Sequence, residues 1–161
     1  MGITLDRQAA SDESRLVLVS LCTLTMRLLE NWRESLANVS PELADCETTM
    51  IIGAIIAIGG ERLIRSNADD GIASLSNTLP VRQLARCNIS SIAVATGIQR
   101  ETVRRRINRL VSEKIVVRDA EGGIAILPEL QQLPWVTEVL YRQIAAVARA
   151  VDQLSRLKVI R

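Results

Sequence analysis

The sequence predicts a mainly α-helical protein that carries one small β-hairpin, on three observations. Apolar residues recur at helical spacing over two long stretches, residues 13–39 and 135–159. Two short apolar runs rich in β-branched residues, 115–118 and 124–127, flank a turn-rich cluster. Aromatic residues make up only 2% of the chain, so a core of Leu, Ile, Val and Ala is expected, which favours helices packed on helices.

The stretch from Ser90 to Glu113 predicts a short helix, a tight turn and a longer helix. Gly97 lies where the short helix would end, and only glycine enters the left-handed conformation there without strain. Ala93 is small enough for a close approach of the two helices. Apolar residues at helical spacing would form the inner face: Ile92, Ile98, Val103, Ile107 and Leu110. This order is typical of a helix-turn-helix.

The second of these helices is strongly basic on the sides that do not bear Val103. A helix that enters the major groove needs long donors to reach guanine and Asn to reach adenine. The residues expected to contact base edges are Gln99, Arg100, Arg104, Arg105 and Asn108. The residues expected to contact phosphates, which fix position rather than sequence, are Thr102, Arg106, Arg109 and Arg118.

A solvated surface is the commoner explanation of an arginine-rich helix face taken alone. The preceding helix and turn favour DNA binding instead. Charge distribution agrees, because residues 82–118 hold nine Lys or Arg and two acids, a net +7, in a chain whose total is +2. A cationic segment in an otherwise acidic chain is expected for a nucleic-acid surface.

Beyond the second helix, a hairpin is predicted. Ile115–Arg118 and Ile124–Leu127 would be its strands, and Asp119–Gly123 its turn. An extended piece from Arg86 to Ile89 could pair as a third strand. The order helix, strand, helix, helix, hairpin is that of a winged helix.

On these residues the chain resembles the bacterial winged helix-turn-helix transcription regulators, the broad group that includes MarR-like repressors. The resemblance covers residues 79–128 and implies a sequence-specific DNA-binding regulator. These regulators usually carry glycine where this chain has Lys114, so a different cap is expected at that helix end. The short, acidic wing tip limits any minor-groove contact to Arg118. The resemblance rests on Ile92-Ala93, Thr96-Gly97-Ile98, Arg100-Glu101-Thr102-Val103-Arg104-Arg105, Leu110 and Ile115-Val116-Val117.

A new helix is expected from Ser40-Pro41 to about Arg65, followed by a linker over Ser66–Pro80. Together with the helices described above, these elements divide the chain into four segments. The segments are a flexible tail at 1–12, a helical dimerisation or core segment at 13–75, a winged helix-turn-helix domain at 76–128 and a C-terminal dimerisation helix at 129–161.

The last helix carries apolar residues spaced 4, 3, 4 and 3, the pattern of a helix pair: Leu140, Ile144, Val147, Val151 and Leu154. Packing within one chain and packing across a two-fold axis would both explain it. Because one short module buries little surface for specific DNA binding, we predict a homodimer through residues 13–39 and 135–159 on an inverted-repeat site.

Other functional classes find less support in the residues. Cys22, Cys46 and Cys87 are isolated and the chain has no His, so neither a disulfide framework nor a metal site is predicted, and no cofactor. No catalytic motif predicts an enzyme. The apolar block Met50–Gly60 is too short to span a bilayer, and a cytoplasmic protein is expected. A winged-helix module that binds protein or RNA without sequence-specific DNA binding is the alternative.

Overall fold

The computed structural model describes residues 2–65 and 87–161. The predicted linker Ser66–Pro80 and Arg86, the first residue of the predicted third strand, lie outside these ranges. Within them the fold is mainly helical with one small two-stranded antiparallel sheet, as the sequence predicts.

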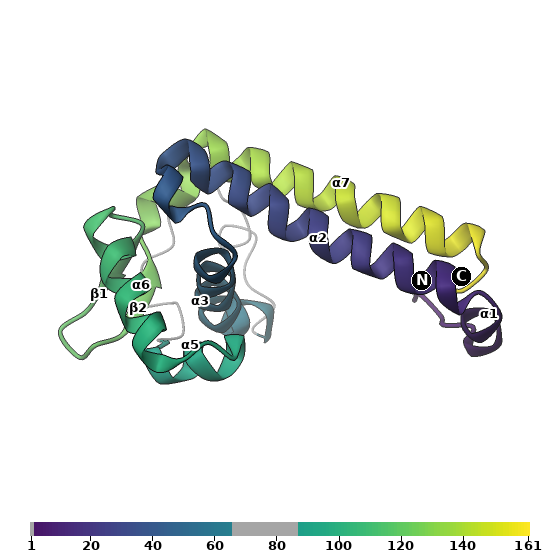
Figure 1. Cartoon of the computed structure of the whole chain (residues 1–161), viewed down its shortest axis with the longest axis horizontal. Coiled ribbons are helices and arrows are strands. Elements are labelled where there is room, and N and C mark those ends of the chain that lie inside the picture. The colour runs from purple at the N-terminus through teal and green to yellow at the C-terminus, as the bar shows by residue number, and fades with distance from the viewer. Residues whose placement is uncertain (1, 66–86) are drawn as a thin grey trace.

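The protein consists of a long arm and a compact body (Figure 1). The arm is formed by α2 (Ser14–Val39) and α7 (Pro134–Arg156), which run antiparallel side by side. Contacts across it include a hydrogen bond from Gln143 Nε2 to the Leu28 carbonyl oxygen, at 3.0 Å. The body contains η1 (Pro41–Leu43), α3 (Cys46–Arg65), α5 (Ile89–Thr96), α6 (Arg100–Ser112), β1 (Val116–Arg118), β2 (Ile124–Ile126) and η3 (Pro128–Gln132).

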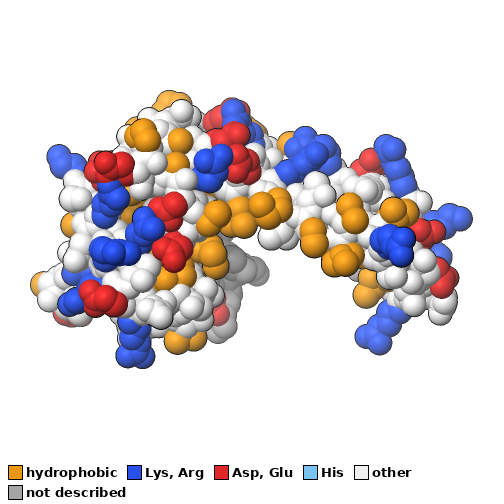
Figure 2. Space-filling model, in the orientation of Figure 1, with side chains coloured by type: hydrophobic (Ala, Val, Ile, Leu, Met, Phe, Trp, Pro, Cys, Tyr) orange, Lys and Arg blue, Asp and Glu red, His pale blue; other side chains and the backbone are white. Residues whose placement is uncertain are grey.

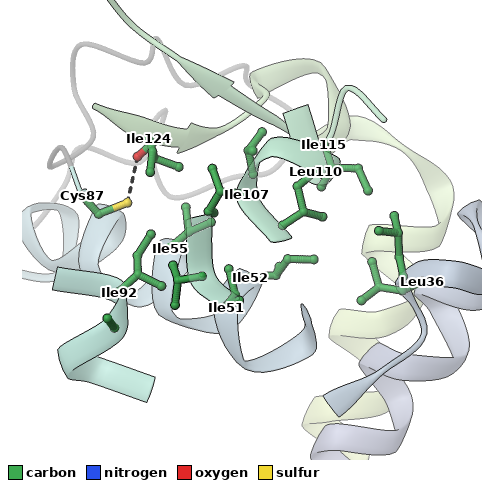
Figure 3. Packing of buried hydrophobic residues seen from close by; sticks show 14 residues of the cluster. Leu36, Ile51, Ile52, Ile55, Cys87, Ile92, Ile107, Leu110, Ile115 and Ile124 are labelled. Atoms are coloured by element: carbon green, nitrogen blue, oxygen red, sulfur yellow. Dashed lines mark hydrogen bonds between the residues drawn. The ribbon is translucent and has the colours of Figure 1, made fainter. Parts of the chain in front are cut away.

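The core of the body is aliphatic and lies between α3, α5, α6 and the hairpin (Figure 3). Ile51, Ile55, Ile92 and Ile107 are completely or almost completely buried there. Leu36, near the end of α2, reaches the same cluster, so the arm and the body share one core. Burial of each such side chain is worth about 1.5–3 kcal/mol, so these contacts hold α6 firmly on its inner side.

Within the described residues the sheet has two strands, and the sequence had left room for a third. β1 pairs antiparallel with β2, with Val116 opposite Ile126 and Arg118 opposite Ile124. The extended piece predicted to end at Ile89 is reduced, within the described residues, to one bridge between Cys87 and Ile124. Ile89 instead begins α5, because the Asn88 side chain caps that helix by accepting from Ser91 N at 2.9 Å.

Residues 40–49 also differ from the expectation. Pro41–Leu43 forms only a short 3-10 turn, and α3 begins at Cys46 rather than at Pro41. Asp45 starts the new helix, because its carboxylate accepts from Thr48 N at 2.9 Å and from Thr48 Oγ1 at 2.8 Å.

The N-terminal residues have more structure than a flexible tail. Residues Arg7–Asp12 form α1, capped by the Asp6 side chain. Thr4 N donates to the Arg161 carbonyl oxygen at 3.0 Å, and Arg161 N donates back to Thr4 at 3.1 Å. The two ends of the chain are therefore paired at the far end of the arm (Figure 1). None of the described helices combines the length and the apolar character needed to cross a lipid bilayer.

Candidate nucleic-acid interface

The inner face of α6 is the one that the sequence predicts. Val103, Ile107 and Leu110 are completely buried, at 0% exposure, and pack in the body core. Because the three side chains lie on one side of the helix, the basic side chains between them must point elsewhere. The rotation of α6 about its own axis is therefore set by its aliphatic residues.

The turn before α6 is also as expected. Gly97 ends α5 in the left-handed conformation, with φ 71° and ψ 3°, and its N–H donates to the Ala93 carbonyl oxygen at 2.9 Å. Three residues, 97–99, separate the two helices. Glycine adopts this backbone conformation without the cost that a Cβ would impose, so α6 can start at once in a new direction.

The end of α6 corrects an expectation. Lys114 adopts the left-handed conformation, with φ 56°, at the position where glycine is usual. Lys114 N donates to the Val111 carbonyl oxygen and Ile115 N to that of Leu110, at 3.1 and 2.9 Å. These two bonds define a Schellman motif, and the residues at its two ends, Leu110 and Ile115, are both buried in the body core. The cap is therefore the ordinary one, made with lysine instead of glycine.

The outward side of α6 and the capping residue before it present all the residues predicted to contact base edges. Gln99, Arg100, Arg104, Arg105 and Asn108 are exposed. Arg104 Nη2 donates to Glu101 Oε1 at 2.8 Å, and this bond lowers the pKa of the Glu101 carboxyl and raises that of Arg104. Arg105 has no ion-pair or hydrogen-bond partner in the described part of the chain.

One flank of α6 faces the hairpin. Arg118, at the end of β1, donates through Nη2 to Asn108 Oδ1 at 3.3 Å. The turn beyond it is closed by Asp119, whose Oδ1 accepts from Glu121 N and Gly123 N at 3.0 and 2.7 Å. The hairpin thus adds one predicted DNA contact, Arg118, to the edge of the α6 surface.

The other flank of α6 faces acids instead of open solvent. Arg106 Nη1 lies 2.6 Å from Asp45 Oδ2, and its Nη2 lies 3.2 Å from Glu47 Oε2. Arg109 pairs with Glu42. Figure 2 shows acidic and basic side chains interspersed over the part of the body where α6 lies. A phosphate would have to displace these carboxylates to reach Arg106 or Arg109.

The remaining predicted phosphate contact, Thr102, is half-buried on α6. Sequence reasoning missed the acids that hold Arg106 and Arg109. The only sequence signal was the spacing of Glu42, Asp45 and Glu47 just before a helix, which by itself indicates only favourable charges at a helix start.

Cys87 lies beneath the hairpin, and its Sγ donates to the Ile124 carbonyl oxygen at 2.8 Å (Figure 3). The residue is 1% exposed, and burial raises the pKa of its thiol to about 11. It therefore behaves as a structural side chain that holds the start of α5 against β2. In the residues that the structure covers, no three His, Cys, Asp or Glu side chains gather as metal ligands would.

Comparison of the chain with protein-family models, with curated proteins and with solved structures finds no match.

Proposed function

We propose that the protein is a DNA-binding transcription regulator that reads duplex DNA with α6. The observation that carries this proposal is the two-sided character of α6. Its inner side chains are fully buried, and its outer side presents exposed Arg104, Arg105 and Asn108 after a glycine turn. A rigid helix with these donors matches the hydrogen-bonding groups of guanine and adenine in the major groove.

In this proposal residues 76–128 act as a winged helix-turn-helix domain. α5 and α6 are the helix pair, the β1–β2 hairpin is the wing, and the bridge at Cys87 supplies the edge of a third strand. Arg118 binds the DNA phosphate backbone beside the groove that α6 enters. It is placed for this contact because it lies next to Asn108 of α6, on the hairpin flank. The part of this domain before residue 87 lies outside the described residues.

The proposed contact set is narrower than the one that the sequence predicts. Base edges are read by Gln99, Arg100, Arg104, Arg105 and Asn108, and phosphates are bound by Thr102 and Arg118. Arg106 and Arg109 are left out because carboxylates from before α3 hold their side chains against the protein, at 20% and 37% exposure. Arg104 is kept because it stays 59% exposed and its partner, Glu101, lies on α6 itself.

We also propose that the arm joins two copies of the chain. Val139, Ala146 and Ala150 of α7 are buried against α2, whereas Ile144 and Val147 remain 56% and 44% exposed. Packing within the chain therefore does not account for most of the 4, 3, 4, 3 pattern in α7. Four of its five residues stay exposed beside the contact with α2: Leu140, Ile144, Val147 and Val151.

α2 carries a matching strip, Leu18 and Leu21, at 62% and 45% exposure. A helix turns by about 100° per residue about its axis. By this measure each strip lies about a quarter turn around its own helix from the line where α2 and α7 touch. Because α2 and α7 are antiparallel, a quarter turn in the same sense brings both strips to one side of the arm. We call these six residues the apolar arm face: Leu18, Leu21, Leu140, Ile144, Val147 and Val151. Figure 2 shows hydrophobic side chains gathered along the arm.

The size of the apolar arm face suits a second copy. Its six side chains are between 37% and 62% exposed. Together they offer on the order of 500 Å² of apolar surface, the upper range for a monomer. A stable interface buries about 800 Å² per partner, of which roughly 65% is apolar in homodimers. A two-fold dimer would then present two α6 helices to an inverted-repeat site.

A gel-shift titration with Arg104→Ala and Arg105→Ala tests the proposed function. Both variants should bind genomic DNA fragments more weakly than the wild type, by about 1–3 kcal/mol for each lost base contact. Arg149→Ala is the matched control, because Arg149 is exposed on the arm, away from α6. Wild-type binding by both α6 variants at every salt concentration would contradict the proposal, and steep salt dependence without sequence preference would favour the interaction-module alternative.

A further inference from the structure

The arginines of α6 divide between two flanks with different surroundings. On the hairpin flank, Arg104 is exposed and lies one helical turn before Asn108, which accepts a hydrogen bond from Arg118. On the opposite flank, Arg106 and Arg109 face residues 42–47. We call residues 42–47 the acidic segment, because three of the six are acids: Glu42, Asp45 and Glu47.

Each contact with the acidic segment joins residues that are far apart in the chain. Arg106 and Asp45 are 61 residues apart and their charged atoms are 2.6 Å apart. The side chain of Arg106 is only 20% exposed and that of Arg109 is 37% exposed. Both guanidinium groups therefore lie against the protein, whereas Arg104, at 59%, extends into solvent.

We propose that the acidic segment withholds Arg106 and Arg109 from the DNA backbone, which limits non-specific binding by α6. The inference rests on the proposed DNA-binding function and concerns its specificity. Non-specific affinity arises almost entirely from phosphate contacts, whereas sequence is read at the base edges. Pairing Arg106 and Arg109 with carboxylates of the protein therefore lowers the affinity for random DNA by a larger fraction than the affinity for a cognate site.

The two withheld arginines differ in how firmly they are held. Asp45 also caps α3 through Thr48, so its carboxylate is fixed and Arg106 is bound to a rigid element. Glu42 is 68% exposed and has no such second role among the described residues. The Arg109–Glu42 pair can thus be opened by mutation with little risk to the fold, and it provides the test.

The experiment is a double-mutant cycle of Glu42→Gln and Arg109→Gln, with binding to a random-sequence duplex measured by fluorescence anisotropy from 50 to 200 mM salt. Glu42→Gln should free Arg109 to bind a phosphate, which steepens the slope of log K against log salt by about 0.9 and tightens binding several-fold at low salt. Arg109→Gln alone should change affinity by less than about twofold, and in the Glu42→Gln background it should remove the whole gain.

Glu138→Gln is the matched control, since it removes the same charge from an ion pair on the arm, away from α6, where Arg142 keeps its second partner Glu34. Its salt slope should equal that of the wild type.

Two outcomes would overturn the role of the acidic segment. If Arg109→Gln alone lowers the slope by about 0.9, phosphates already displace Glu42 in the wild-type complex. If the gain from Glu42→Gln survives the loss of Arg109, the acid acts only by repulsion. A wild-type protein that binds no duplex at all would instead refute the DNA-binding function itself, and this inference with it.

Discussion

Asp45 at the start of α3 and Arg106 in the middle of α6 are joined at 2.6 Å, between Oδ2 and Nη1. The same carboxylate accepts two hydrogen bonds from Thr48, so one side chain both starts α3 and holds α6. Arg106 Nε is buried without a hydrogen-bond partner in the described part of the chain. The guanidinium group therefore depends on its two carboxylates for compensation.

Asp45→Ala should lower the free energy of unfolding by about 2–3 kcal/mol. Loss of a helix N-cap costs about 1 kcal/mol, and a half-buried guanidinium deprived of its closer partner costs a further 1–2 kcal/mol. Urea denaturation measures the change. Asp152→Ala is the control, because Asp152 pairs with Arg156 on the exposed side of α7 and should matter by less than about 0.5 kcal/mol. Equal losses of unfolding free energy for Asp45→Ala and Asp152→Ala would contradict the double role of Asp45.

Lys114→Gly should stabilise the protein by about 1 kcal/mol. A residue with a Cβ pays for the left-handed conformation that Lys114 adopts, and glycine does not. For a chain of this length the change corresponds to a rise in Tm of roughly 2–4 °C, which calorimetry resolves.

Lys114→Ala keeps the Cβ and should give no such gain. The same substitution to glycine can be made at Lys158, which has φ 59° after α7. Lys158 N donates to the Ser155 carbonyl oxygen and Val159 N to that of Leu154, so this helix also ends in a Schellman motif. An equal rise in Tm for Ala and Gly at position 114 would show that the backbone there is not left-handed.

The three thiols should differ in reactivity. Cys22 and Cys46 are exposed, whereas Cys87 is buried and its pKa is raised to about 11. Ellman's reagent at pH 8 should therefore titrate two thiols quickly and the third only on unfolding. The folded state raises the pKa of Cys87 from its usual value of 9.0. This thiol therefore does not affect the free energy of unfolding below pH 9, and it lowers that free energy as the pH rises from 9 through 11. Three thiols that react at one rate would contradict this placement.

Ile144→Glu should convert the proposed dimer into a monomer. A carboxylate at the centre of the apolar arm face would be buried without a partner, which costs several kcal/mol in the interface. Sedimentation velocity at micromolar concentration measures the change. Ala145→Glu is the control, because Ala145 is exposed on the same helix, one turn from Arg142 and Arg149 and outside the apolar arm face. A wild-type monomer, or a dimer unaffected by Ile144→Glu, would contradict the proposed interface.

Features set by neighbours in the chain were predictable from the sequence. The burial of Val103, Ile107 and Leu110 follows from helical spacing, and the conformation of Gly97 follows from its place between two helices. Both depend on interactions within a few residues.

Features set by distant contacts were not predictable. An arginine on the flank of a helix has the same spacing whether it faces a phosphate or a carboxylate, so nothing local to Arg106 indicated Asp45. At Lys114 the packing of Ile115 against the core overrides the residue's own backbone preference. α3 begins later than the sequence predicts, because Asp45 caps it, after a short turn whose Leu43 is buried in the core.

The most direct measurement is selection of bound duplexes from a random pool by wild-type protein and by Arg105→Ala. The wild type should enrich a short inverted repeat whose half-sites are about 10 base pairs apart, or a multiple of that spacing. Arg105→Ala should lose the preference at one position in each half-site and keep the rest. No enriched sequence, or the same motif from both proteins, would contradict the reading of DNA by the exposed side of α6.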